Sequence, residues 1–255
     1  MRHELKDLTI LIPVRIESII RLENLQAVIK YLTKYFDVNI YVLEASVYNN
    51  GILKSILPQQ IKYKYIKDLD PVFYRTKYIN MMASCVQTKY LAIWDADVVF
   101  PINQVLEALE LLRSGIYSFS FPYDGRFLDT SQIIREIFIE YEDIELLQSL
   151  HNYMTLPYGN NMKGGAFFAN TEKYRESGLE NLRFYGWGPE DWERHERWLN
   201  FGHTMKSVKG VLFHLSHPRD MNGMHNSVQQ KSYTFYEKDL TRYSSKEELK
   251  SRFKL

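Results

Sequence analysis

The sequence has almost no cysteine, no long apolar run and almost no net charge. Its 255 residues include one cysteine, Cys85, which excludes an internal disulfide and fits a reducing compartment. No segment approaches the roughly 20 consecutive apolar residues that a membrane-spanning helix needs, and the first apolar run is too short for a signal peptide. We therefore expect a cytoplasmic protein without an integral membrane segment, in solution or peripherally at the inner membrane face.

The charges nearly cancel, because 32 lysines and arginines face 31 aspartates and glutamates, for a net charge of +1. Nucleic-acid partners favour strongly basic surfaces, so we expect none here. Hydrophobic residues make up 45% of the chain, which is enough for a sizeable core. Aromatic residues reach 15%, a share that sugar-binding sites and aromatic cores explain equally well.

Short apolar runs alternate with amphipathic segments along most of the chain. We expect strands at residues 8–12, 38–43, 62–66, 90–94, 98–100, 116–121, 166–169 and 211–215. We expect helices at residues 18–36, 76–86, 102–112, 131–150 and 190–199. This alternation predicts an α/β fold with a mostly parallel central sheet flanked by helices. Ligands of such sheets bind beyond the carboxyl ends of the strands.

No repeat, low-complexity tract or clear linker divides the sequence, so we expect one domain over residues 1–255. The loop at 153–165 is rich in glycine, asparagine and proline, and is long enough to be functional. After residue 218 the chain becomes polar and ends in a charged helix from about residue 245. We expect the tail after about residue 244 to be loosely attached.

Two aspartates follow the buried strand in the run KYLAIWDADVVFP, residues 89–101. Buried carboxylates must be paired or bind a metal. Alternate residues of an extended segment share a face, so Asp95 and Asp97 can point the same way. Mg²⁺ and Mn²⁺ take one or two carboxylates together with substrate phosphates, so a metal site is one interpretation. An Asp-rich turn after a strand is the alternative.

A tryptophan between two glycines precedes an acidic helix start in YGWGPEDWE, residues 185–193. The glycines indicate a backbone that is bent or closely approached at Trp187. Pro189 suits the first position of a helix, and the helix dipole favours Glu190 and Asp191 in the first turn. The functional interpretation is a carboxylate kept ionised and ready to accept a proton. An ordinary acidic helix start is the alternative.

Two histidines, His214 and His217, stand at the end of the last predicted strand. If that strand runs through both, alternation places them on opposite faces, and only one faces the site. A histidine there can join the two aspartates in binding a metal. A structural or exposed histidine is the alternative.

Taken in order, these runs resemble the catalytic domain of the β-1,4-galactosyltransferase-like glycosyltransferases. They also resemble the bacterial capsule-type and chondroitin-polymerase-type relatives that share a GWGxED element. The matching runs lie between about residues 8 and 220 and are LIPVR, FYRTKYIN, WDADVVF, LPY followed by GGAFF, FYGWGPEDWE and HPRD. The resemblance implies one GT-A-type domain that binds a nucleotide-sugar and a divalent metal. Its nucleotide-binding part would be about 1–125, its acceptor and catalytic part about 126–220, and its polar tail about 221–255.

The resemblance also implies a role for each matching position. Nucleotide-sugar contacts would come from Pro13, Arg15, Arg75, Asp95 and Gly164, with the two arginines adding charge at the phosphates. Mn²⁺ or Mg²⁺ would be bound by Asp97 and His217, with His214 as the alternative to His217. Acceptor contacts would come from Gly165, Trp187 and Glu190. The general base would be Asp191.

The chain departs from the family pattern at Pro189 and Trp192, where the family has a glycine and an acid. Both positions adjoin the acceptor, whose identity is therefore not carried over. The implied activity is the metal-dependent, inverting transfer of a hexose or N-acetylhexosamine from a UDP-sugar. Galactose or GalNAc is the sugar that the resemblance favours. The acceptor would be a glycan or lipid-linked saccharide in capsule or surface polysaccharide synthesis. A retaining transferase of the same fold and a catalytically silent sugar- or nucleotide-binding module are the alternatives.

Overall fold

A seven-stranded sheet lies at the centre of the computed structural model, which describes residues 2–218 and 221–255. The strand order is β3-β2-β1-β4-β8-β6-β9. These strands are β1 (His3–Val14), β2 (Phe36–Ser46), β3 (Lys62–Lys67), β4 (Tyr90–Trp94), β6 (Phe119–Phe121), β8 (Ala166–Asn170) and β9 (Met205–Ser207). Only β8 runs antiparallel to its neighbours, β4 and β6. The expectation of a mostly parallel sheet is confirmed.

A second, three-stranded sheet has the order β5-β10-β7. It consists of β5 (Val98–Val99), β10 (Val211–His214) and β7 (Arg126–Asp129). Strand β10 pairs antiparallel with β5 and parallel with β7, so that His214 lies opposite both Val98 and Asp129. This small sheet therefore brings three distant parts of the chain to one point beside Asp97.

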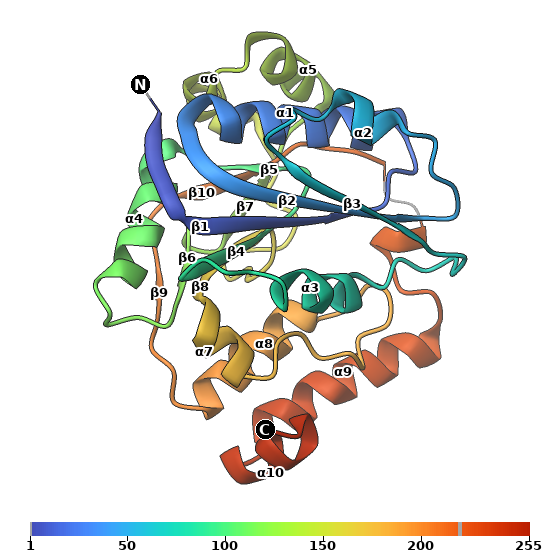
Figure 1. Ribbon diagram of the computed structural model, residues 1–255, viewed down its shortest axis with the longest axis vertical. Helices are drawn as coiled ribbons and strands as arrows, with labels where there is room; N and C mark the ends of the chain where they lie inside the picture. The colour runs from blue at the N-terminus through green and yellow to red at the C-terminus, as the bar shows by residue number, and fades with distance from the viewer. Residues whose placement is uncertain (1, 219–220) are drawn as a thin grey trace.

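Helices cover both faces of the central sheet, as the sequence predicts. Figure 1 shows α1 and α2 over one face and α3 over the other. The Ser18 side chain caps α1 by accepting a hydrogen bond from the Arg21 N–H, which confirms the predicted helix start. The helices of the first 200 residues, apart from the segment at 131–150, are α1 (Ile19–Tyr35), α2 (Ile52–Ile56), α3 (Arg75–Ala83), α4 (Ile102–Arg113), α7 (Thr171–Glu176) and α8 (Glu190–Asn200).

The apolar periodicity of segment 131–150 predicts one helix, but the structure has two helices there. Helix α5 (Gln132–Tyr141) ends at Glu142, whose φ of 51° is left-handed, and α6 (Ile144–Ser149) begins after it. The Asp143 side chain caps α6. Apolar periodicity continues across the break, so it does not reveal the capping residue that divides the two helices.

The carboxyl-terminal segment folds into α9 (Val228–Tyr243) and α10 (Lys246–Phe253). The charged helix from about residue 245 is thus confirmed, whereas α9 was not predicted. The expectation of a loosely attached tail is wrong, because Leu249 is fully buried and the Arg197 guanidinium lies 4.4 Å from the centre of the Phe253 ring. The tail is anchored by a buried apolar side chain and a cation–π contact, together with the ion pair between Arg252 and Glu237 and a hydrogen bond from Lys246 to the Phe201 carbonyl.

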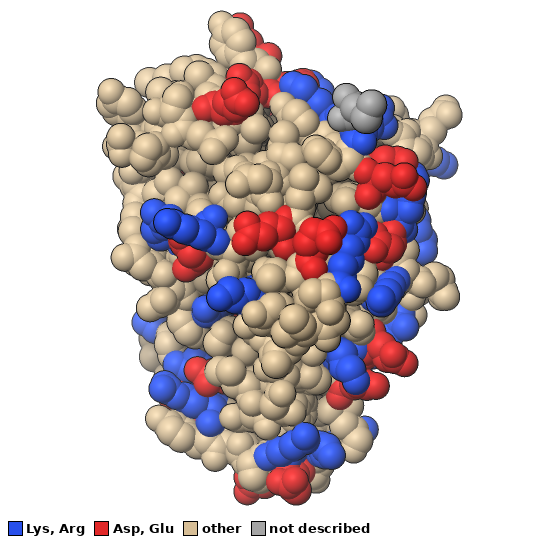
Figure 2. All heavy atoms as spheres, turned by 90° about the vertical axis from the view of Figure 1, so that its left-hand side faces the viewer, with Lys and Arg blue, Asp and Glu red and all other residues tan. Residues whose placement is uncertain are grey.

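Charged side chains of both signs are interspersed over the face drawn in Figure 2, without a large patch of one sign. This distribution agrees with the net charge of +1. None of the helices in the described ranges combines the length and the apolar character that crossing a bilayer requires.

We expect Leu249→Ala to lower the free energy of unfolding by about 2–5 kcal/mol, the usual cost of truncating a buried leucine. Leu255→Ala, at a half-exposed position, is the matched control and should change it by less than about 0.5 kcal/mol. Urea denaturation followed by circular dichroism measures both. Equal stability of the two variants would mean that α10 does not dock as described.

Candidate functional site

A cavity of about 690 Å³ opens beyond the carboxyl ends of β1 and β4, a volume typical of small-molecule sites. All the site residues expected from the sequence line it. They are Pro13, Arg15, Arg75, Asp95, Asp97, Gly164, Gly165, Trp187, Glu190, Asp191, His214 and His217. The fold therefore brings together motifs that are far apart in the sequence.

The two aspartates after β4 are placed by a turn and not by strand alternation, because the strand ends at Trp94. The Asp95 N–H donates a hydrogen bond to the Gly165 carbonyl at 2.8 Å. The Asp97 carbonyl accepts one from the Leu215 N–H at 2.7 Å. Each aspartate is thus fixed through its backbone to a different segment of the cavity wall.

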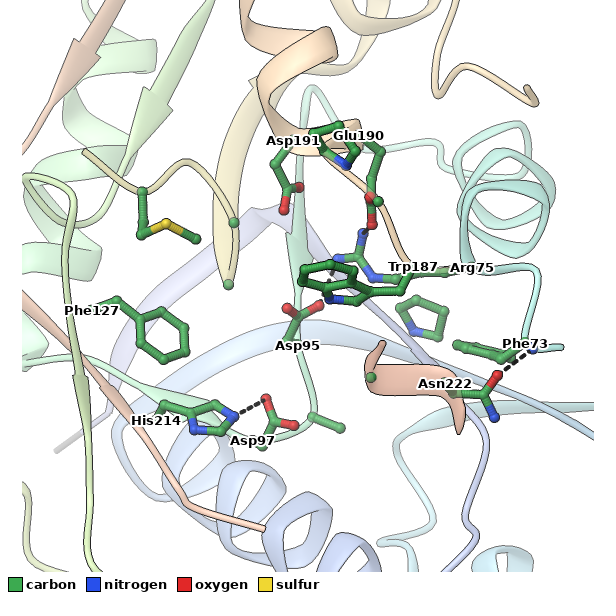
Figure 3. A pocket seen from close by; sticks show the side chains of 18 of the residues that line it. Phe73, Arg75, Asp95, Asp97, Phe127, Trp187, Glu190, Asp191, His214 and Asn222 are labelled. Atoms are coloured by element: carbon green, nitrogen blue, oxygen red, sulfur yellow. Dashed lines mark hydrogen bonds and ion pairs between the residues drawn. The ribbon is translucent and has the colours of Figure 1, made fainter. Parts of the chain in front are cut away.

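Asp97, His214 and His217 form a cluster whose ligand atoms all lie within 4.8 Å of one another. His217 Nε2 is 3.1 Å from Asp97 Oδ2, and His214 Nε2 is 3.8 Å from Asp97 Oδ1. Figure 3 shows His214 pointing at Asp97. The expectation that only one histidine faces the site is wrong, because β10 ends at His214 and strand alternation does not extend to His217.

The hydrogen bonds of the two imidazoles leave their Nε2 atoms for a cation. His214 Nδ1 is 2.7 Å from Asp129 Oδ1, and His217 Nδ1 is 2.8 Å from the Pro218 carbonyl. Both partners only accept, so each Nδ1 carries a proton and each Nε2 is turned towards Asp97. Burial alone would lower the pKa of His214, but the Asp97 and Asp129 carboxylates raise it, so a divalent cation would bind there by displacing a proton. The three side chains therefore fit a divalent metal.

Arg75, the first residue of α3, lies between Asp95 and Glu190 (Figure 3). Its Nη2 donates to Asp95 Oδ1 at 2.6 Å, and its Nη1 is 4.0 Å from Glu190 Oε1. Within the described part of the chain, Arg75 Nη1 and Glu190 Oε2 are buried without a hydrogen-bond partner. Buried polar atoms are rarely left so, and the hydroxyl groups of a bound ligand would satisfy both.

Asp191 is held from behind by a buried arginine. Arg194 Nη2 donates to Asp191 Oδ1 at 2.6 Å, and Arg194 Nη1 donates to Glu180 Oε2 at 2.7 Å. The other carboxylate oxygen, Asp191 Oδ2, faces the backbone of Gly164, where a Cβ would lie only 2.4 Å away. Glycine at 164 thus leaves space for Oδ2, which remains available to a ligand.

The two neighbouring carboxyl groups titrate in opposite directions. Burial, together with the charge of Asp191, raises the pKa of Glu190 to about 8. Burial would also raise the pKa of Asp191, but the Arg194 and Arg75 guanidinium charges outweigh it and the pKa is lowered. At neutral pH Asp191 is therefore ionised and Glu190 is mostly protonated. The sequence favours the helix dipole as the cause of the ionised state of Asp191, whereas the structure shows that two arginines stabilise this carboxylate.

Arg15 lines the cavity, but its charge is already neutralised. Its Nη2 donates to Asp68 Oδ2 at 2.5 Å, its Nε to the Ala45 carbonyl at 2.9 Å and its Nη1 to the Asp70 carbonyl at 2.8 Å. These bonds hold the loop after β3 against the end of β1. Arg15 is thus better suited to shaping the cavity wall than to binding an anion.

Helix α9 explains the glycines around Trp187. A Cβ at Gly188 would lie 3.2 Å from the Thr234 side chain, so α9 packs directly on that backbone. Gln230 Nε2 donates to the Tyr185 carbonyl at 3.1 Å and to the Trp187 carbonyl at 2.8 Å. The close backbone approach that the glycines predict is made by a helix that the sequence did not predict.

A further contact that the sequence did not predict joins a turn near the carboxyl end of the chain to residues in its first third. The 3-10 turn η2 (Met221–Gly223) carries Asn222, whose Oδ1 accepts a hydrogen bond from the Phe73 N–H at 2.7 Å and whose Nδ2 donates to Glu17 Oε1 at 2.6 Å. Arg219 and Asp220, the end of the HPRD run, lie outside the described residues. Asn222 has no sequence signal, since nothing local links it to Phe73.

Comparison with solved structures identifies the fold. A mannosyltransferase from Pyrobaculum calidifontis in complex with GDP-Man and Mn²⁺ aligns at a TM-score of 0.58 with 11% identity, over 97% of this chain and 67% of that one. Glucosyl-3-phosphoglycerate synthase from Mycobacterium tuberculosis, with Mn²⁺, UDP and phosphoglyceric acid, aligns at 0.49 with 15% identity, over 83% and 71%. No family model and no curated protein sequence matches. The chain has the GT-A fold of nucleotide-sugar-dependent glycosyltransferases, and the resemblance to the β-1,4-galactosyltransferase family stays a prediction.

We expect His214→Ala and His217→Ala each to weaken Mn²⁺ binding by more than about 100-fold, because each removes an Nε2 from the cluster. Asp129→Asn should weaken it by about 10–100-fold, the usual effect of losing a partner that orients a ligand. Calorimetric titration with Mn²⁺ in the presence of UDP measures the affinities, and His151→Ala is the exposed control. A large effect in only one histidine variant would contradict a two-histidine site.

Proposed function

We propose that the protein is a metal-dependent, inverting glycosyltransferase that moves a hexose or N-acetylhexosamine from a UDP-sugar to an acceptor hydroxyl. Galactose or GalNAc is the proposed sugar, and a glycan or lipid-linked saccharide of capsule or surface polysaccharide synthesis the proposed acceptor. One observation carries the proposal: the Asp97–His214–His217 cluster and an ionised carboxylate with a free oxygen, Asp191 Oδ2, lie in the same cavity. The GT-A fold supports it.

The donor side of the cavity is the side of the metal cluster. A divalent metal bound there would neutralise the charge that develops on the departing diphosphate. Two imidazole nitrogens and one carboxylate suit Mn²⁺ better than Mg²⁺, which prefers oxygen ligands. Arg75 has a buried Nη1 without a hydrogen-bond partner among the described residues, and this atom can donate to an oxygen of the nucleotide-sugar. Asp95 keeps Arg75 in place for that contact.

The acceptor side is the side of Asp191 and Glu190. The acceptor hydroxyl attacks the anomeric carbon while its proton moves to Asp191 Oδ2 and the bond to the diphosphate oxygen breaks. Arg194 stabilises the carboxylate before the transfer and keeps it oriented. Glu190, in its neutral form, can donate a hydrogen bond to an acceptor oxygen. Trp187 lines the same part of the cavity and offers a wall for a sugar ring.

A donor screen tests the proposal. The protein is incubated with Mn²⁺, a panel of UDP- and GDP-sugars, and mono- and disaccharide acceptors, and nucleotide release is measured. We expect release of UDP from one donor, enhanced by an acceptor and lost on chelation. Nuclear magnetic resonance of the product distinguishes inversion from retention, the alternative mechanism on this fold. Nucleotide-sugar binding without release from any donor would favour the silent binding module.

We expect Asp191→Asn to lower kcat by about 10²–10⁴-fold, the usual contribution of general base catalysis. The amide keeps the shape of the side chain and loses its basicity, so donor affinity should change little. Steady-state kinetics at saturating donor and acceptor measure kcat. Asp143→Asn, a remote helix cap that asparagine fills equally well, is the control. Near-normal turnover of the Asp191 variant would exclude Asp191 as the base.

We expect kcat/KM to fall as the pH rises through about 8, because the neutral form of Glu190 is lost as its pKa is passed. Glu190→Gln fixes a neutral side chain that still donates hydrogen bonds. This variant should keep much of its activity at pH 7 and should not lose it at higher pH. A pH–rate profile from pH 6 to 9.5 measures both proteins. The same alkaline decline in both would show that another group titrates.

A further inference from the structure

Helices α8 and α9, which pack against each other, both contribute to the lining of the cavity. After Asp191, their lining residues are Trp192 and Glu196 from α8 and Phe235, Lys238 and Arg242 from α9, which we call the α9 end. With a rise of 1.5 Å per residue, the α9 side chains span about 10 Å along the helix. The α9 end follows α8 away from the Asp191 carboxylate, so it continues the acceptor side of the cavity.

Basic side chains predominate at the α9 end. Lys238 is 3.1 Å from the half-exposed side chain of Asp239, a surface pair that binds weakly. Within residues 2–218 and 221–255, Arg242 has no acidic partner, and Glu196 is the one acid among the five lining residues. Lys231 lies on the same stripe of α9, one turn before Phe235 and two turns before Lys238. The stripe thus presents cations beside the cavity.

Aromatic rings accompany these cations. The Lys238 Nζ lies 5.2 Å from the centre of the Phe235 ring, and Phe235 is half-exposed. Trp192 lines the same end from α8, and Trp187 lines the cavity closer to Glu190. Ring faces bind the apolar faces of sugars, whereas guanidinium and ammonium groups bind oxyanions. The combination suits a ligand that is a saccharide at one end and an anion at the other.

We propose that the acceptor is an anionic saccharide whose phosphate or carboxylate group contacts Lys238 and Arg242 while its reacting hydroxyl lies at Asp191. This inference rests on the proposed function and names the class of its acceptor. Two sources provide the same chemistry: a water-soluble sugar phosphate or uronate, and the diphosphate of a lipid-linked saccharide. The oxyanion at the α9 end is distinct from the donor diphosphate, which belongs to the Asp97 cluster.

Matched acceptor pairs test this inference with the donor that the screen identifies. The pairs are N-acetylglucosamine with its 1-phosphate, glucose with glucuronate, and a soluble sugar diphosphate with its lipid-linked counterpart in detergent. The variant is Lys238→Gln combined with Arg242→Gln, and Lys250→Gln on the exposed surface of α10 is the control. Nucleotide release gives the acceptor KM and kcat for each protein.

Within each pair, we expect the anionic acceptor to have a lower KM than the neutral one. The double variant should raise the KM of the anionic acceptor by about tenfold more than that of the neutral one, with little change in kcat. A still lower KM for the lipid-linked compound would identify the lipid diphosphate as the source, and equal values would identify the soluble anion. Equal KM values for neutral and anionic acceptors, both unaffected by the double variant, would overturn the inference while leaving the transferase intact. Absence of nucleotide release from every donor of the screen would overturn the proposed function, and this inference with it.

Discussion

Four of the carboxyl groups that line the cavity lie in its middle, and their mutual repulsion is the constraint on which the rest of the site depends: Asp95, Asp97, Glu190 and Asp191. Buried acids this close cannot all stay ionised unless cations or protons offset them. The protein meets the constraint in three ways. Arg75 pairs with Asp95, Arg194 pairs with Asp191, and Glu190 keeps its proton. Asp97 lies beside the Nε2 atoms of His214 and His217, and the three side chains together fit a divalent cation.

These compensating groups are positioned by packing far from the cavity. Arg194 is shared between Asp191 and the buried Glu180, whose backbone N–H and carbonyl are both bound by Asn80 at 2.8 and 2.9 Å. Asn80 lies on α3, the helix that begins with Arg75. One helix therefore supplies Arg75 to the cavity directly and supports the Asp191 carboxylate through two intermediates, Glu180 and Arg194. A rigid displacement of α3 would change the charge balance at both ends of the reaction centre.

How far the sequence predicts the site depends on whether a signal is local. The pairs Asp95–Asp97 and Glu190–Asp191 could be predicted because each stands in a short run with its own strand or helix boundary. Asp129 could not, because it meets His214 from 85 positions away through the pairing of β7 with β10. Strand alternation also misjudged His217, since the end of a strand is the least certain part of a sequence-based prediction. The inner strands β4 and β8 were predictable because they are short and almost wholly apolar, whereas the edge strand β9 has no apolar run and was not predicted.

Helix α9 escaped prediction because its buried face is polar. Thr241 Oγ1 donates to Glu193 Oε1 at 2.9 Å, and Thr234 and Glu237 are also buried. Hydrogen bonds to α8 and the glycine backbone replace the apolar stripe that sequence analysis looks for. The same helix therefore has two separate duties: its buried face fixes the segment around Trp187, and its cavity face carries Lys238 and Arg242. Because different side chains serve each duty, Lys238 and Arg242 can be replaced without disturbing the packing that positions Trp187, Glu190 and Asp191.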